Sequence, residues 1–188
     1  MRGTRTQLLV EIALTIALAA VLDMLRLWRM PYGGSVSLTM LPIFVLAFRR
    51  GLLPGLAGGA LYGVVDVLIS PSPFVHWVQP FLDYPVAYMM VGLAGVTARP
   101  LADALSKRAS GRAFALMTGG VFLGATGRYI VHWFSGLVFF GEYAPEGQPA
   151  WLYSALYNLY IPVSAVGCLI AAVLLVPALA RIVPADPA

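Results

Sequence analysis

The sequence predicts an all-α integral membrane protein with six transmembrane helices and with both termini in the cytoplasm. Its 188 residues are 60% hydrophobic and 11% charged, whereas a soluble domain is about 45–50% apolar and about 25% charged. The apolar residues are gathered in runs that are separated by charged or turn-forming residues. The length favours one domain, so we expect a single membrane-embedded domain over residues 1–188.

The first predicted helix covers residues 8–28, since about 20 mostly apolar residues can span a bilayer. Its start mimics a secretory signal with a cleavage site near Ala17-Leu-Ala19. The apolar run continues past that site, so we expect a retained helix. The second predicted helix, 35–48, is short for a crossing and is expected to be tilted, irregular or buried in protein. Within it, Pro42 is expected to leave the carbonyl of Leu38 without its usual donor.

The third predicted helix covers residues 52–69 and carries a stripe of glycines. They recur every four residues, at Gly51, Gly55, Gly59 and Gly63. Small residues at this spacing let another helix backbone approach closely. We therefore predict that this stripe serves packing rather than chemistry.

The fourth predicted helix, 77–96, contains polar residues between two prolines, in the run Gln79-Pro-Phe-Leu-Asp83-Tyr84-Pro85. Pro85 cannot donate to the carbonyl of Phe81, which predicts a local disturbance of the helix next to Asp83. Residues 98–112 are polar and basic and are expected to form a cytoplasmic connection.

The fifth predicted helix, 113–140, carries a cation and a histidine at membrane depth. Such groups are costly to insert and indicate a functional site. Arg128, His132, Gly136 and Phe140 follow one another at intervals of four residues and form a stripe on one helix face. This stripe is predicted to be one wall of a pocket.

The sixth predicted helix, 151–179, begins with several tyrosines. Pro162 cannot donate to the carbonyl of Asn158, so a disturbance is expected there too. Tyr153 and Asn158 lie about 140° apart around an ideal helix. They can line one pocket only if the helix is distorted or if the protein wraps around the ligand.

The distribution of basic residues sets the predicted orientation. Only Arg26 and Arg29 fall on one side, and the other side holds Arg2, Arg5, Arg49, Arg50, Arg99, Lys107, Arg108, Arg112 and Arg181. The richer side is cytoplasmic by the positive-inside tendency. This topology explains the net charge of +4 without any nucleic-acid partner.

Three segments then bring polar and aromatic residues to the outer end of the bundle: 79–84, 128–140 and 153–158. Ligand pockets are mostly apolar and aromatic with a few placed polar groups. Here a carboxylate can accept hydrogen bonds while aromatic rings stack on a flat ring. A flat, cationic ligand would use all of these groups.

Plainer interpretations remain open for several of these residues. Tyrosines and tryptophans near helix ends are commonly interface anchors, and His132 could simply bind a neighbouring helix. Asp83 and Arg128 could form a structural ion pair. Asp66, near the end of the third helix, is expected to be solvated.

Signatures of enzymes and of cofactor sites are lacking in the sequence. It has no GxSxG, HExxH, P-loop or dinucleotide motif, and the pair His132 and Ser135 makes a weak nucleophile–base case. The single Cys168 excludes an internal disulfide and a cysteine-based metal cluster. We expect no enzyme, no metal and no cofactor, and any ATP-driven transport must use a separate ATPase.

Four motifs resemble one known family, the thiamine-specific S-components (ThiT family) of energy-coupling factor transporters. They are Leu82-Asp83-Tyr84-Pro85, Arg128-x-x-x-His132-x-x-Ser135-Gly136-x-x-Phe139-Phe140-Gly141-Glu142-Tyr143-Ala144, Tyr153-Ser-Ala-Leu-Tyr157-Asn158, and Arg49-Arg-Gly-Leu-Leu-Pro-Gly55. The resemblance implies six membrane helices in the cell membrane and thiamine bound from outside. It also implies delivery through a transmembrane coupling subunit driven by two ATPase subunits.

The resemblance also implies roles for individual residues. The implied ligand contacts are Asp83, Tyr84, His132, Gly136, Tyr153 and Asn158. Phe140 stands where the family commonly has a stacking tryptophan, Asp83 where it commonly has glutamate, and Arg128 at a basic position near the site. Ala13 and Ala17 resemble the motif that docks to the coupling subunit, and 28–34 resembles a gating loop. The alternatives are an S-component for another vitamin or precursor, a membrane enzyme acting on a small metabolite, and an assembly factor.

Overall fold

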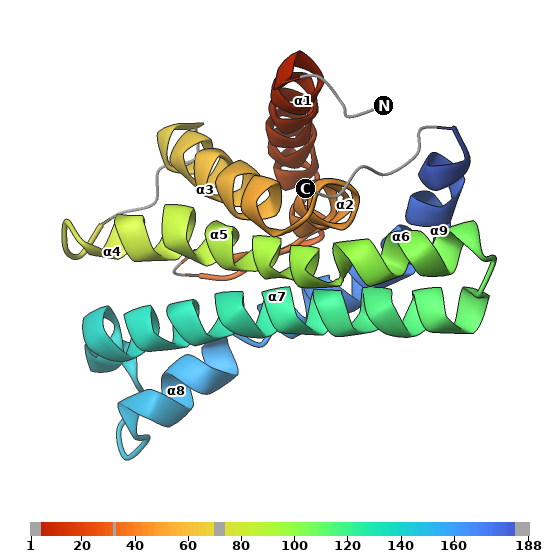
Figure 1. The fold of residues 1–188 in the computed structure, drawn as a ribbon. Helices are drawn as coiled ribbons and strands as arrows, with labels where there is room; N and C mark the ends of the chain where they lie inside the picture. The colour runs from red at the N-terminus through yellow and green to blue at the C-terminus, as the bar shows by residue number, and fades with distance from the viewer. Residues whose placement is uncertain (1–4, 32, 70–73, 183–188) are drawn as a thin grey trace.

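The computed structural model describes residues 5–31, 33–69 and 74–182, and it is almost entirely helical (Figure 1). The first helix, α1 (Arg5–Met24), ends before the predicted residue 28. The chain then forms a two-stranded antiparallel ribbon of β1 (Trp28–Arg29) and β2 (Ser35–Val36). Gly33 and Gly34, with φ of 103° and 83°, supply the left-handed backbone of its turn.

The short second helix, α2 (Met40–Arg50), is buried along nearly its whole length. The expectation that it is buried in protein is confirmed, but its predicted start at residue 35 is wrong because β2 occupies that segment. The expectation that Pro42 leaves the carbonyl of Leu38 without a hydrogen-bond donor is also wrong. Pro42 lies in the first turn, where backbone N–H groups have no intrahelical acceptor, and Leu41 N donates to Leu38 O at 2.9 Å.

The third helix, α3 (Leu52–Ile69), has the predicted bounds and packs against a long helical run over residues 79–106. This run consists of α4 (Gln79–Phe81), η1 (Leu82–Val86), α5 (Ala87–Val91), η2 (Gly92–Thr97) and α6 (Ala98–Ser106). The segment η1 is a π-helical turn that contains Pro85, so the predicted disturbance is confirmed.

The fourth helix is longer than the predicted 77–96, because α6 continues it into the expected cytoplasmic connection. The apolar residues of α6 recur on one face, and Ala98, Leu101 and Ala104 are buried. This periodicity is that of an amphipathic helix, which the abundance of polar residues in 98–112 obscured. After a turn, α7 (Ser110–Phe139) returns alongside the whole run (Figure 1).

The last predicted helix, 151–179, is two helices. A short η3 (Gly141–Tyr143) follows α7, and then α8 (Ala150–Tyr157) and α9 (Tyr160–Ile182) are separated by a break at Asn158. Because Pro162 has no N–H, Ile161 N donates to Asn158 O instead, at 3.0 Å. The predicted disturbance before Pro162 is confirmed.

The glycine stripe of α3 lies directly against the backbone of the run 79–106. A Cβ on Gly55 would lie 2.9 Å from Gly92 O, and one on Gly59 would meet the backbone of Tyr88. A Cβ on Gly63 would meet the backbone of Tyr84. The predicted role in close helix packing is therefore confirmed.

In the part of the chain that the structure describes, five helical segments are long and apolar enough to cross a membrane. They are Arg5–Met24, Leu52–Ile69, Gln79–Ser106, Ser110–Phe139 and Ala150–Arg181. Large apolar side chains such as Phe122 and Leu174 are mostly exposed on them, as lipid-facing side chains are. With 11 residues, α2 is shorter than the about 20 residues of a lipid-exposed spanning helix, and it is enclosed by other helices.

We predict that Gly59→Ala destabilises the protein by about 1–3 kcal/mol, because the new methyl group displaces the backbone around Tyr88. Thermal unfolding in detergent measures the effect. The matched control is Gly119→Ala on α7, where a Cβ meets no atom of the described residues within 4 Å. Equal unfolding midpoints for the two variants would contradict the packing role.

Candidate ligand-binding site

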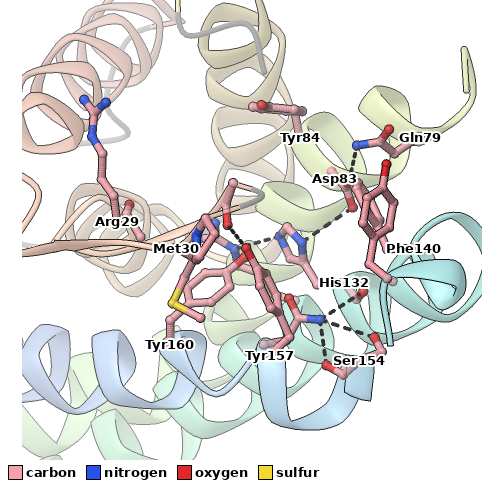
Figure 2. A pocket seen from close by; sticks show the side chains of 18 of the residues that line it. Arg29, Met30, Gln79, Asp83, Tyr84, His132, Phe140, Ser154, Tyr157 and Tyr160 are labelled. Carbon is pink, nitrogen blue, oxygen red and sulfur yellow. Dashed lines mark hydrogen bonds and ion pairs between the residues drawn. The ribbon is translucent and has the colours of Figure 1, made fainter. Parts of the chain in front are cut away.

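A cavity of about 490 Å³ lies where α3, the run 79–106, α7, α8 and the β1–β2 ribbon meet (Figure 2). The structure brings together on its lining all the residues that were predicted for the ligand site: Asp83, Tyr84, Arg128, His132, Gly136, Phe140, Tyr153 and Asn158. The volume suits a small organic molecule.

Asp83 stands on the π-helical turn η1 and is held by a neighbour one turn earlier. Gln79 Nε2 donates to Asp83 Oδ2 at 3.0 Å, while Gln79 Oε1 accepts from Val75 N at 3.0 Å. His132 Nδ1 lies 3.5 Å from Asp83 Oδ1 (Figure 2). Asp83 is thus fixed in orientation from both sides.

Arg128 is buried, with 8% of its surface exposed, and it does not point out of the bundle. Its guanidinium carbon lies 4.0 Å from the centroid of the Tyr88 ring, a cation–π contact. Its Nε donates to His132 Nε2 at 3.5 Å. Arg128 is therefore linked to Asp83 through His132.

These contacts favour one neutral tautomer of His132. Since Nε2 accepts from Arg128, the ring proton is on Nδ1, which faces the carboxylate of Asp83. A neutral imidazole with this tautomer satisfies both neighbours. His132 therefore bridges a cation and an anion without carrying charge itself.

The α7–α8 wall depends on hydrogen bonds between helices. Asn158 Nδ2 donates to His132 O at 3.3 Å and to Ser154 O at 2.9 Å, and Ser154 Oγ donates to Trp133 O at 2.8 Å. Gly136 leaves the room for Ser154, since a Cβ there would meet its Oγ. Asn158 caps α8 at the helix break, and both Tyr153 and Asn158 line the cavity.

The β1–β2 ribbon closes another side of the cavity. Arg29, Met30 and Gly34 line it from this ribbon. The ribbon is tied to α8, because Tyr157 Oη donates to Gly33 O at 2.9 Å. The segment that resembled a gating loop therefore borders the cavity.

Sequence reasoning missed several lining residues, among them Asp23, Arg26, Asp66, Tyr88 and Tyr160. The expectation that Asp66 is solvated is wrong, since it is only 5% exposed. Asp66 lies inward because it shares a helix face with Tyr62, four residues earlier, which is fully buried. The spacing alone does not indicate this orientation, because neighbouring helices determine that Tyr62 is buried.

Among the described residues, the cavity lining carries charges of both signs. Asp23, Asp66 and Asp83 face Arg26, Arg29 and Arg128. Arg26 binds the side chain of Asp23 and donates from Nε to Asp23 O at 2.8 Å. The positive charge of the arginines near the site is thus offset in part by Asp23 of α1 and Asp66 of α3.

The comparisons with known proteins agree with this arrangement. The model of the thiamine transporter protein family (Thia_YuaJ) matches residues 9–184. The chain belongs to this family. Thiamine transporter ThiT of Bacillus subtilis (strain 168) is 39% identical over 183 residues, covering 96% of this chain and 95% of that protein.

Two further comparisons support the same family. Thiamine transporter ThiT of Lacticaseibacillus paracasei is 37% identical over 126 residues, which cover 63% of this chain and 61% of that protein. A solved structure of ThiT from Listeria monocytogenes superimposes with a TM-score of 0.82 at 27% identity, covering 97% of both chains. The family resemblance of the sequence is confirmed.

Membership in a transporter family, together with the apolar helices, makes this chain a multi-pass membrane protein. It also confirms the prediction that the chain is a transporter component and not an enzyme. No catalytic role is therefore assigned to His132 and Ser135.

We predict that Tyr157→Phe loosens the β1–β2 ribbon, because it removes the bond to Gly33 O. One such hydrogen bond contributes about 1 kcal/mol, so amide exchange in the ribbon should quicken about fivefold. Hydrogen–deuterium exchange with mass spectrometry measures this. The control is Tyr129→Phe, which removes a similar bond to Ala155 O away from the cavity and should leave the ribbon unchanged.

Proposed function

We propose that this chain is the thiamine-binding S-component of an energy-coupling factor transporter, and that the cavity is its thiamine site. The observation that carries the proposal is the convergence of Asp83, His132 and Asn158 with aromatic side chains around one cavity, in a chain of the thiamine transporter family. The protein captures thiamine on the extracellular side and has no catalytic step of its own.

The chemistry of thiamine suits the lining. Its aminopyrimidine is flat and carries an amino group, which can donate a hydrogen bond to the oriented carboxylate of Asp83, and Asn158 and Tyr153 line the same cavity. Its thiazolium ring is permanently cationic, and the rings of Phe140, Tyr84 and Tyr153 can hold it by cation–π and stacking contacts. No metal or cofactor is needed for such binding.

We further propose the topology and the partners. Residues 1–188 form one unit in the plasma membrane, with six membrane-embedded helices and both termini cytoplasmic, as the distribution of basic residues favours. Ala13 and Ala17 are exposed on α1, which suits close docking of a coupling subunit. Two separate ATPase subunits supply the energy.

Thiamine binding to the purified protein tests the proposal by titration calorimetry. Asp83→Asn should weaken it about tenfold to a hundredfold, since a hydrogen bond to a charged group contributes about 1.5–3 kcal/mol. Asp103→Asn, at an exposed position on α6, is the matched control and should bind normally. Tight binding of riboflavin or biotin without any binding of thiamine would show that the chain is an S-component for another vitamin.

The docking proposal is tested by co-purification with the coupling subunit. Ala17→Leu should reduce the yield of the assembled complex severalfold, because a bulky side chain separates the two helices. Thiamine binding should stay intact. Ala115→Leu, at an exposed alanine of α7, is the control, and a normal yield of complex with Ala17→Leu would remove α1 from the interface.

A further inference from the structure

Asp66 is a buried carboxylate on the cavity lining to which no role in binding has been given. It is 5% exposed, it lines the cavity from α3, and its Oδ1 has no hydrogen-bond partner among the residues that the structure describes. A buried polar atom without a partner is uncommon in folded proteins. Such an atom inside membrane-spanning structure calls for a functional explanation.

The three carboxylates of the lining differ in what already holds them. Asp23 pairs with Arg26 and also accepts from Thr39 Oγ1 at 3.4 Å. Asp83 accepts from Gln79 and lies beside His132. Among the residues that the structure describes, Asp66 keeps one carboxylate oxygen, Oδ1, without a hydrogen-bond partner.

The nearby cations of the cavity are also engaged elsewhere. Arg26 binds Asp23 through its side chain and backbone. Arg128 lies on the ring of Tyr88 and donates to His132. Arg26 and Arg128 still act on Asp66 electrostatically, but no ion pair within 4 Å is found for Asp66 among the described residues, so a bound cation can lie against its unmatched oxygen.

We propose that Asp66 is the counter-ion for the cationic ring of the ligand, an inference that rests on the proposed thiamine function. A quaternary thiazolium cannot lose its charge by releasing a proton, so burial requires a compensating anion. The thiazolium nitrogen has no N–H group and cannot donate a hydrogen bond. A nearby carboxylate can nevertheless stabilise its positive charge electrostatically. In this arrangement, Asp83 accepts a hydrogen bond from the aminopyrimidine, and Asp66 stabilises the positive charge of the thiazolium ring.

The test compares thiamine with an isosteric analogue in which a neutral thiophene replaces the thiazolium ring. The unaltered protein should bind thiamine at least about tenfold more tightly, because only thiamine gains from a buried counter-charge. Asp66→Asn should weaken thiamine by a similar factor and leave the affinity for the neutral analogue unchanged. Asp66→Glu should retain part of the preference, and Asp103→Asn all of it.

Each other outcome overturns the assignment in a recognisable way. Equal affinities of the unaltered protein for both compounds would exclude a counter-ion, whether or not the variants fold. An equal loss for both compounds in Asp66→Asn would assign Asp66 to hydrogen bonding or to the architecture of the cavity. A complete lack of thiamine binding by the unaltered protein would overturn the proposed function itself, and the counter-ion with it.

Discussion

The backbone contact between α3 and the helical run 79–106 is the constraint on which the cavity depends. Lipid gives no hydrophobic drive for helices to associate, so close packing of small residues must supply it. The glycines of α3 bring its axis against the backbone around Tyr88 and Gly92. This approach places the α3 carboxylate, Asp66, on the same lining as Tyr88 and Asp83.

Two local disturbances of the backbone then shape the site on this scaffold. The π-helical turn with Pro85 carries Asp83, and the break before Pro162 carries Asn158. In a regular helix the backbone N–H and C=O groups bond to one another, but an interruption leaves some of them without these partners. At membrane depth such an interruption is tolerated only where protein or a cavity surrounds it, and both of these interruptions line the cavity. Proline thus acts at the two places where polar side chains must converge.

Helix periodicity and the chemistry of proline allowed much of this to be predicted from sequence. The bounds of α3, the glycine contact and the disturbances at Pro85 and Pro162 follow from local rules, and the stripe from Arg128 to Phe140 lies on the cavity as expected. The β1–β2 ribbon could not be predicted, because its strands have two residues each. The inward position of Asp66 depends on neighbouring helices, which local sequence does not reveal.

The buried helix α2 is held in place by protein rather than by lipid. A segment of about 20 apolar residues can enter the bilayer by itself, but α2 offers 11 residues, nearly all of which contact protein. Two hydrogen bonds join Arg50 of α2 to Glu11 of α1, at 2.7 and 2.8 Å, and α2 also packs on α3. These protein contacts stabilise α2 in place of contacts with lipid. The position of α2 therefore depends on its contacts with α1 and α3, so these three helices form one cooperative packing unit.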